Sequence, residues 1–203
     1  MSTDFLAGDG APRAVVPSPV GAHSVVRRLF AGLSCVAAAM MVASEARYRG
    51  FESRLAAGAV HQLLGYSAVA VTDRQTFFFA FDSGGSRHML GLDVSLGCSS
   101  VFLLAPMLML TGILAAYSAK PLFGLGVAAM AAAAVIVGVN LLRLVMIAAL
   151  MVWWGVQTGF GWGHTLFGSI LTLVGLTAAS AVYYVIVARG NRPRVGRVRR
   201  SRS

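Results

Sequence analysis

The chain has 203 residues, of which 57% are hydrophobic and only 12% are charged. Soluble domains carry about 25% charged residues, so this composition excludes an ordinary soluble globular protein and favours a helical membrane protein. The formal net charge is +10, and seven arginines crowd into residues 189–203, directly after an apolar segment. This position favours a cytoplasmic anchor near anionic lipid over a nucleic-acid-binding tail.

Acidic residues are absent from the second half of the chain, since all seven lie at or before Asp93. That half therefore offers neither a pair of carboxylates sharing a site nor a carboxylate ligand for a metal. The two cysteines form no CxxC motif. Because Cys35 is expected within a span and Cys98 at a membrane surface, we expect no disulfide between them. We expect no metal site and no cofactor.

The N-terminal residues 1–22 are rich in Gly, Pro, Ala and Ser, which is typical of a disordered leader. The first apolar run begins only at Leu29 and resembles an anchor more than a cleavable signal peptide. It predicts a span over residues 29–46. Arg27 and Arg28 precede this span and favour a cytoplasmic leader.

Residues 47–97 are the only sizeable segment expected outside the membrane. Its patterns are, in chain order, a helical stripe over 52–64, short strands over 68–81, a turn over 82–86 and an alternating strand over 90–96. We expect a small hairpin platform that leads to Cys98 and is too short to form an independent domain core.

Three uncharged runs follow, and hydropathy places spans at 99–117, 121–141 and 165–187. Because arginines at both ends of the membrane region favour the cytoplasm, the number of crossings is even and four crossings fit. The stretch Leu144–Trp154 is left over. At 11 residues it is too short to cross. We expect a re-entrant or interfacial helix there, or else the end of a longer tilted span.

The expected fold is an all-α integral membrane protein with about four transmembrane helices, one re-entrant or interfacial helix and a small extracytoplasmic region. Residues 23–188 form this membrane domain, and residues 189–203 form a basic cytoplasmic tail. The protein is then multi-pass in the cell membrane, with both termini in the cytoplasm. The topology brings four residues to the outer face, namely Cys98, Asn140, Arg143 and His164. The spans were placed by hydropathy, without reference to these four residues.

Cys98 lies where the outer loop becomes a membrane helix. Ser99 and Ser100 can cap that helix, so Cys98 is close to its N-terminus. Exposed amides and the helix dipole favour a thiolate there, which makes Cys98 a candidate nucleophile. The ordinary alternative is a small buried apolar side chain.

Arg143 stands between two leucines, where a charged side chain costs about 3 kcal/mol at the bilayer centre. It either extends to lipid headgroups or faces a polar site. Asn140 lies on the same helical face, and the pair could bind a substrate carbonyl and stabilise an oxyanion. His164 could serve as a base for the thiol, or simply be an interfacial residue. His61 and His88 compete for that role but have no membrane-embedded scaffold.

Three motifs stand in a fixed order, each at the start or end of a span: Leu-Gly-Cys98-Ser99-Ser100, Asn140-Leu-Leu-Arg143 and Gly163-His164. This order resembles the exosortase/archaeosortase family of integral membrane cysteine transpeptidases, over about residues 50–188. The resemblance makes Cys98, Arg143 and His164 the catalytic residues. The family's usual Cys-Ser-Gly is Cys98-Ser99-Ser100 here, and the chain lacks the extra N-terminal spans of larger members.

The resemblance implies a cysteine protease or transpeptidase that cleaves a C-terminal sorting signal of exported proteins at the extracytoplasmic face. Cys98 would form a thioester, which an acceptor amine or water resolves. The partners implied are membrane-anchored substrates, with a short motif, a hydrophobic helix and basic residues, and membrane lipid, but no nucleic acid. The alternative is a non-catalytic assembly or transport subunit. A serine protease using Ser99 or Ser100 with His164 would need more spans and leave Cys98 unexplained.

Overall fold

The computed structural model describes residues 20–83 and 85–189, with side chains from Ser24 onward. Residues 1–19 of the expected leader and nearly all of the expected tail lie outside these residues, while residues 20–22 belong to the first helix. The elements are α1 (Val20–Ala43), α2 (Glu45–Leu64), β1 (Ser67–Val71), a 3₁₀ turn (Thr72–Arg74), β2 (Thr76–Ser83), β3 (Ser86–Asp93), a second 3₁₀ turn (Leu96–Cys98), α3 (Val101–Tyr117), α4 (Leu122–Trp154), α5 (Val156–Trp162), a π-helical turn (Gly163–Phe167) and α6 (Gly168–Arg189).

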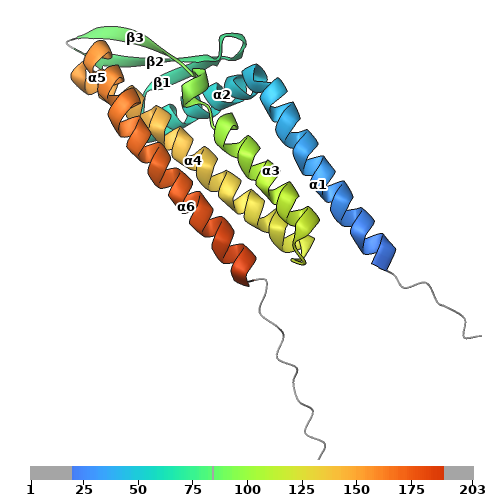
Figure 1. Cartoon of the computed structure of the whole chain (residues 1–203). Coiled ribbons are helices and arrows are strands. Elements are labelled where there is room, and N and C mark those ends of the chain that lie inside the picture. The colour runs from blue at the N-terminus through green and yellow to red at the C-terminus, as the bar shows by residue number, and fades with distance from the viewer. Residues whose placement is uncertain (1–19, 84, 190–203) are drawn as a thin grey trace, which may run out of the picture.

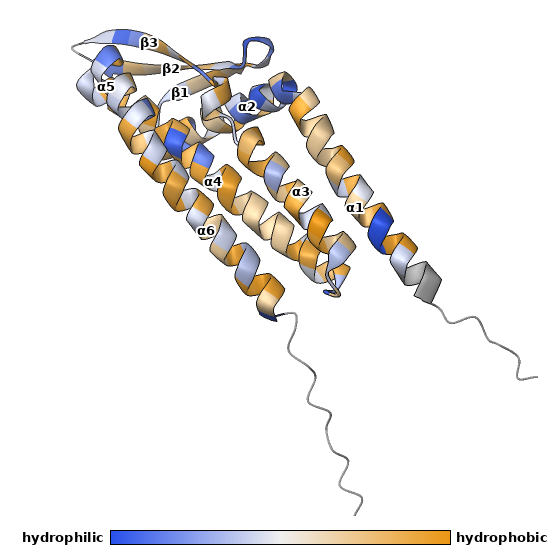
Figure 2. Cartoon of the chain, in the orientation of Figure 1, coloured by the Kyte–Doolittle hydropathy of each residue, from blue (hydrophilic) through white to orange (hydrophobic). Residues whose placement is uncertain are grey.

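Four long helices, α1, α3, α4 and α6, lie side by side, and the other elements gather at one end of them (Figure 1). We call that end the head; it contains α2, the strands, α5 and the part of α4 from Leu144 to Trp154. Hydrophobic residues run along the four helices, and hydrophilic ones concentrate in the head (Figure 2). Three described helical segments, 24–43, 122–154 and 156–189, are long and apolar enough to cross a membrane, and α3 is a shorter apolar helix. The expected helical membrane fold is confirmed.

Small residues allow the helices of the bundle to approach closely. Ala128 and Ala132 of α4 are buried against α3 and α6, in a cluster with Leu104 and Tyr183. Gly175 of α6 lies against Val139, where an added Cβ would come within 2.5 Å of that side chain. In lipid, van der Waals packing through such small residues replaces the hydrophobic effect as the force between helices.

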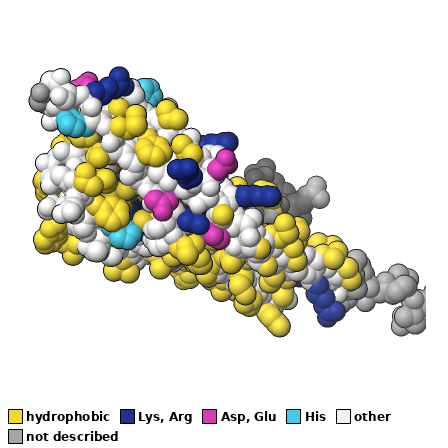
Figure 3. Space-filling view, turned by 90° about the horizontal axis from the view of Figure 1, so that it is seen from above, with side chains coloured by type: hydrophobic (Ala, Val, Ile, Leu, Met, Phe, Trp, Pro, Cys, Tyr) yellow, Lys and Arg dark blue, Asp and Glu magenta, His cyan; other side chains and the backbone are white. Residues whose placement is uncertain are grey.

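The head contains an antiparallel sheet with the strand order β1-β2-β3. Alternation along β2 turns Phe77 and Phe79 inward, and both are fully buried against Ala56 and Val60 of α2. Seen from above, basic and acidic side chains lie beside one another over the head (Figure 3). The hairpin platform expected from the sequence is present, although its last strand ends at Asp93.

Helix α4 runs without a break through Arg143, so Leu144–Trp154 is not a separate re-entrant helix but the end of a longer one. With 33 residues, α4 is about 50 Å long and exceeds the hydrocarbon core of about 30 Å. Leu144, Ile147 and Ala148 are fully buried and belong to the core of the head. The part of this stretch from Leu144 to Met151 is apolar because protein covers it, whereas Trp153 and Trp154 are exposed.

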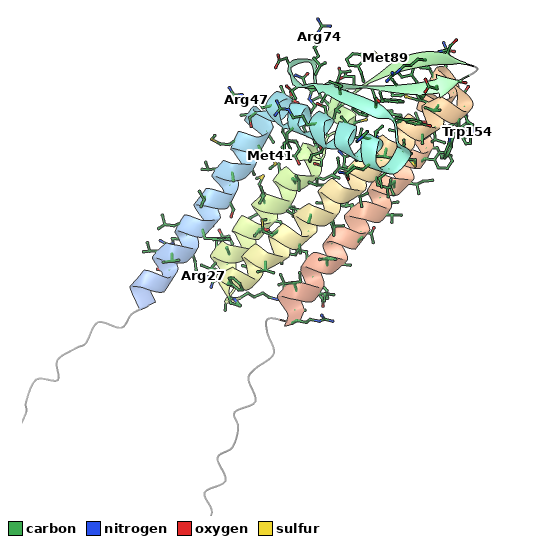
Figure 4. All side chains as sticks on the ribbon, turned by 180° about the vertical axis from the view of Figure 1, so that it is seen from behind. Arg27, Met41, Arg47, Arg74, Met89 and Trp154 are labelled. Carbon is green, nitrogen blue, oxygen red and sulfur yellow. The ribbon has the colours of Figure 1, made fainter. Side chains whose placement is uncertain are left out.

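Basic side chains satisfy helix C-terminal carbonyls at the end of the bundle opposite the head. Arg27 donates to the carbonyl oxygens of Ala115, Ser118 and Lys120, and Lys120 Nζ donates to Val187 O at 3.4 Å. Figure 4 places Arg27 at this end, far from Arg74 in the head. Cations here interact favourably with the negative ends of the α3 and α6 dipoles.

Candidate active site

Cys98 ends the 3₁₀ turn that joins the sheet to α3, and it is buried in the core of the head. Its Sγ lies 3.3 Å from Nδ1 of His164, a residue 66 positions later in the chain, directly after α5. This distance is that of a hydrogen bond to sulfur. Burial and a chemical partner therefore coincide at this thiol.

His164 lies in the π-helical turn between α5 and α6, where Gly168 N–H donates to Gly163 O. A π turn inserts one extra residue, and such turns are frequent at functional sites. The imidazole stacks flat on Phe160, with ring centroids 5.3 Å apart and an interplanar angle of 3°. The stacking holds the ring plane, so Nδ1 points at Cys98.

Arg143 projects from α4 toward both the nucleophile's loop and the histidine, and it is only 7% exposed. Its Nη1 donates to Gly97 O at 3.0 Å and to Thr172 Oγ1 at 3.4 Å, and its Nη2 lies 3.5 Å from His164 Nδ1. A guanidinium has no acceptor atom, so Nδ1 accepts. This contact fits the tautomer with its proton on Nε2, in which the lone pair of Nδ1 is shared between the guanidinium and the Cys98 thiol.

Asn140 lies one turn before Arg143 on α4 and is buried behind the nucleophile's loop. Its Nδ2 donates to Cys98 O at 2.8 Å and to Oε1 of Glu52 at 2.9 Å. An amide nitrogen carries two protons, so both are engaged. Three residues expected at one level, Cys98, Arg143 and His164, thus form a connected set, and Asn140 supports it from behind.

Glu52 was not anticipated as part of this site. It is 1% exposed, and its Oε1 accepts from Ser100 N at 3.0 Å, from Ser100 Oγ at 2.7 Å and from Asn140. A signal for it exists in the sequence: Glu52, Ala56 and Val60 recur every four residues and form the buried face of α2. An acidic residue within such a stripe indicates a buried polar site.

The two competing histidines contact other parts of the head. His61 is exposed, and its Nδ1 lies 3.0 Å from Tyr66 O. His88 stacks on Phe81 of the neighbouring strand. No group of three or more His, Cys, Asp or Glu side chains among residues 20–83 and 85–189 could hold a metal ion.

An apolar groove of about 450 Å³ lies between α3 and α6, with α4 as its floor. It is lined by Phe102, Leu103, Pro106, Met107, Leu110, Ala132, Ile136, Leu176, Ala179, Ser180 and Tyr183. A small hollow that shares Leu103, Ile136 and Leu176 with it reaches Asn140 and Thr172. The groove therefore leads from the apolar bundle toward the polar site.

Gly168 permits the close approach of α6 to Arg143, because an added Cβ would lie 2.6 Å from Arg143 Nε. We expect Gly168→Ala to displace the guanidinium and to slow alkylation of Cys98 by about tenfold, since a nearby cation favours the thiolate. The measurement is the rate of haloacetamide labelling in a Cys35→Ala background. Gly126→Ala, where a Cβ meets open space, should match the parent. Equal rates for Gly168→Ala and Gly126→Ala would contradict this role.

These features define a class: a helical membrane protein with a thiol, an imidazole and a guanidinium gathered where its bundle meets the head. The chain belongs to the transmembrane exosortase family, whose model matches residues 20–181. No curated protein and no solved structure matches the chain. Family membership implies a membrane cysteine transpeptidase that acts on membrane-anchored proteins.

Proposed function

We propose that this protein cleaves the C-terminal sorting signal of membrane-anchored exported proteins through a thioester on Cys98, and then transfers or releases the product. One observation carries the proposal: Cys98 Sγ lies 3.3 Å from His164 Nδ1, and Arg143 contacts both that nitrogen and the carbonyl of Gly97. A thiol beside a base, with a fixed cation at the same place, is the arrangement that acyl transfer requires.

The proton moves within this set. His164 Nδ1 takes the proton of Cys98, and the thiolate attacks the scissile carbonyl, forming a C–S bond. The protonated His164 gives the proton to the leaving amine as the C–N bond breaks. An acceptor amine or water then attacks the thioester, again losing its proton to His164, and Cys98 leaves as a thiol.

We assign the oxyanion of the tetrahedral intermediate to Arg143: Gly97 O and Thr172 Oγ1 engage Nη1 and His164 engages one proton of Nη2, which leaves the second Nη2 proton for the oxyanion. Asn140 was expected to help at the substrate carbonyl, but both its amide protons are engaged by Glu52 and Cys98. In our proposal Asn140 therefore serves the reaction by holding the Cys98 carbonyl. A charge-assisted contact to a developing oxyanion is the largest single contribution in many acyl-transfer enzymes.

We propose that the head is extracytoplasmic and that both chain ends are cytoplasmic. The end opposite the head carries Arg27, Arg28, Lys120 and Arg189 and no acidic residue among those described, and the arginine-rich residues 190–203 follow Arg189 in the sequence. The head carries both signs, because its arginines stand among the described acidic residues, Glu45, Glu52, Asp73, Asp82 and Asp93. Basic residues flanking spans mark the cytoplasmic side. Residues 23–188 then form the membrane domain, and the site opens to the compartment into which its substrates are exported.

The substrate's hydrophobic helix, in this proposal, lies in the groove between α3 and α6. The groove is apolar along the bundle and approaches Asn140 and Thr172, which contact Cys98 O and Arg143. A helix seated there, with its N-terminal end at the head, would place the short motif that precedes it beside Cys98. Ligand sites between helices of a bundle have this character.

The direct test is capture of the thioester. Membranes containing the full-length protein and its natural substrates are quenched in acid, and the Cys98 peptide is analysed by mass spectrometry. We expect an adduct on Cys98 that neutral hydroxylamine removes, and none on Cys35. Substrate processing without any adduct on Cys98 would refute the mechanism. A non-catalytic assembly or transport subunit, which would use Arg143 and the glycine-rich stretch 155–164 only for helix contact, predicts neither processing nor an adduct.

A further inference from the structure

Glu52 is a buried acid that takes no part in the proton path described above. Among the described residues no cation lies within ion-pairing distance of it, in contrast to Glu45 on the same helix, which pairs with Arg49 at 2.6 Å. Its Oε2 is buried and has no partner among these residues. A buried carboxylate is expensive unless hydrogen bonds compensate it, so its retention calls for an explanation.

Two of the three donors to Glu52 Oε1 belong to Ser100, which follows the nucleophile in the chain, and the third belongs to Asn140 of α4. Ser100 N–H is a free amide at the start of α3, so Glu52 caps that helix with a side chain from α2. Asn140 donates to Glu52 and, with its other proton, to Cys98 O. The backbone from Cys98 to Ser100 is therefore held at both ends by one connected set of hydrogen bonds.

Ser100 adds a third connection to this set. Its hydroxyl proton goes to Glu52 Oε1, so Tyr48 OH, 2.9 Å away, must donate to Ser100 Oγ. Tyr48 and Glu52 are four residues apart on α2 and share its inner face. Burial raises the pKa of Tyr48, which keeps its hydroxyl protonated as a donor. A glycine at residue 100 would lack this link.

We infer that Glu52 is a positioning residue for the nucleophile: by accepting three hydrogen bonds on one oxygen, it fixes the backbone that presents Cys98 to His164. This inference rests on the proposed function of the Cys98–His164 pair. The essential feature is an acceptor oxygen at this point. The donors belong to Ser100, at the start of α3, and to Asn140 of α4, and the acceptor that reaches both is a side chain of α2. A displaced nucleophile would lose contact with its base even though both residues remain.

The test measures the pH profile of Cys98 alkylation by a haloacetamide, in the full chain with Cys35→Ala. We expect Glu52→Ala to slow alkylation at neutral pH by about tenfold or more and to give the profile of His164→Ala. The double variant should be no slower than His164→Ala alone, because both changes break the same contact. Glu52→Gln retains the acceptor oxygen and should keep the parental profile, although its Nε2 lacks an acceptor. Glu45→Gln is the matched control on α2 and should change nothing.

The outcomes separate the two proposals. If His164→Ala slows alkylation and Glu52→Ala does not, or if their effects simply add, the role of Glu52 is overturned while the catalytic pair stands. If Glu52→Gln is as slow as Glu52→Ala, acceptance of hydrogen bonds is not its contribution, and the inference fails. If His164→Ala has no effect, the catalytic pair fails and Glu52 loses its role with it. Should Glu52→Ala not fold, Glu52→Asp decides, since its shorter side chain cannot reach Ser100 and Asn140 together and must reproduce the His164→Ala profile.

Discussion

Cells that carry Cys98→Ala in place of the parent protein should accumulate uncleaved substrate precursors, with processing reduced on the order of 10⁴-fold or more. The reason is that, among the described residues, Cys98 is the nucleophilic side chain in hydrogen-bond contact with His164. Cys98→Ser should be almost as inactive, because a serine hydroxyl is a much weaker nucleophile than a thiol at neutral pH. Mass spectrometry of the C-terminal peptides of membrane proteins measures the effect.

Cys35→Ala is the matched control for this experiment, since Cys35 is the other cysteine of the chain and is exposed on α1. It should process substrates at the parental rate. Parental processing by Cys98→Ala, in membranes that contain the variant at the parental amount, would remove Cys98 from the mechanism. Activity retained only by Cys98→Ser would instead favour a mechanism with an oxygen nucleophile.

Arg143→Lys should reduce processing by about 10²- to 10³-fold although the charge is conserved. Arg143 reaches Gly97 O, Thr172 Oγ1 and His164 Nδ1 together, through two different nitrogens of a planar group. A lysine ammonium is one compact donor group and cannot span these partners. Because the cation is kept, the loss would report geometry, and the measurement is the rate of precursor conversion in membranes.

Arg49→Lys provides the comparison for Arg143→Lys. Arg49 also donates to a backbone carbonyl, Val94 O at 3.2 Å, and pairs with Glu45, but it lies outside the site. We expect its replacement to change processing by less than about threefold, as for other partly exposed ion pairs. If Arg143→Lys processes substrate as fast as Arg49→Lys, the guanidinium has no special role at the oxyanion.

Hydropathy predicted the bundle because each span had to be apolar toward lipid or toward its neighbours. Hydropathy also led us to expect a re-entrant or interfacial helix at Leu144–Trp154, which is instead the end of α4. Residues covered by protein and residues covered by lipid are both apolar, so hydropathy does not distinguish them. Leu144 and Ile147 are buried under the sheet and α2, and no glycine or proline lies between Gly138 and Gly155 to interrupt α4. Only the tertiary contacts of the head distinguish one continuous helix from a crossing followed by a re-entrant segment.

The site could be predicted as a set of residues at one level, but not as a network. The end of each span fixes the height of Cys98, Arg143 and His164 to within about a turn, and the order of motifs then indicated the family, which the family model confirms. The extra residue of the π-helical turn changes the direction in which the His164 side chain points, and hydropathy does not detect such a turn. Glu52 was missed because most residues on the inner face of α2 are small, so that hydropathy did not distinguish this face as buried.

The length of α4 has a consequence for substrate choice. Arg143 lies 21 residues after Leu122, which places it about 32 Å along the helix, close to the thickness of the hydrocarbon core. Because α4 is one continuous helix, the distance between Arg143 and the opposite end of the bundle is fixed. For the proposed cleavage, this fixed distance predicts that a sorting motif displaced by two residues from its hydrophobic helix is shifted by roughly 7 Å and misses the nucleophile. The proposed function therefore predicts that substrates are selected by spacing as well as by the motif itself.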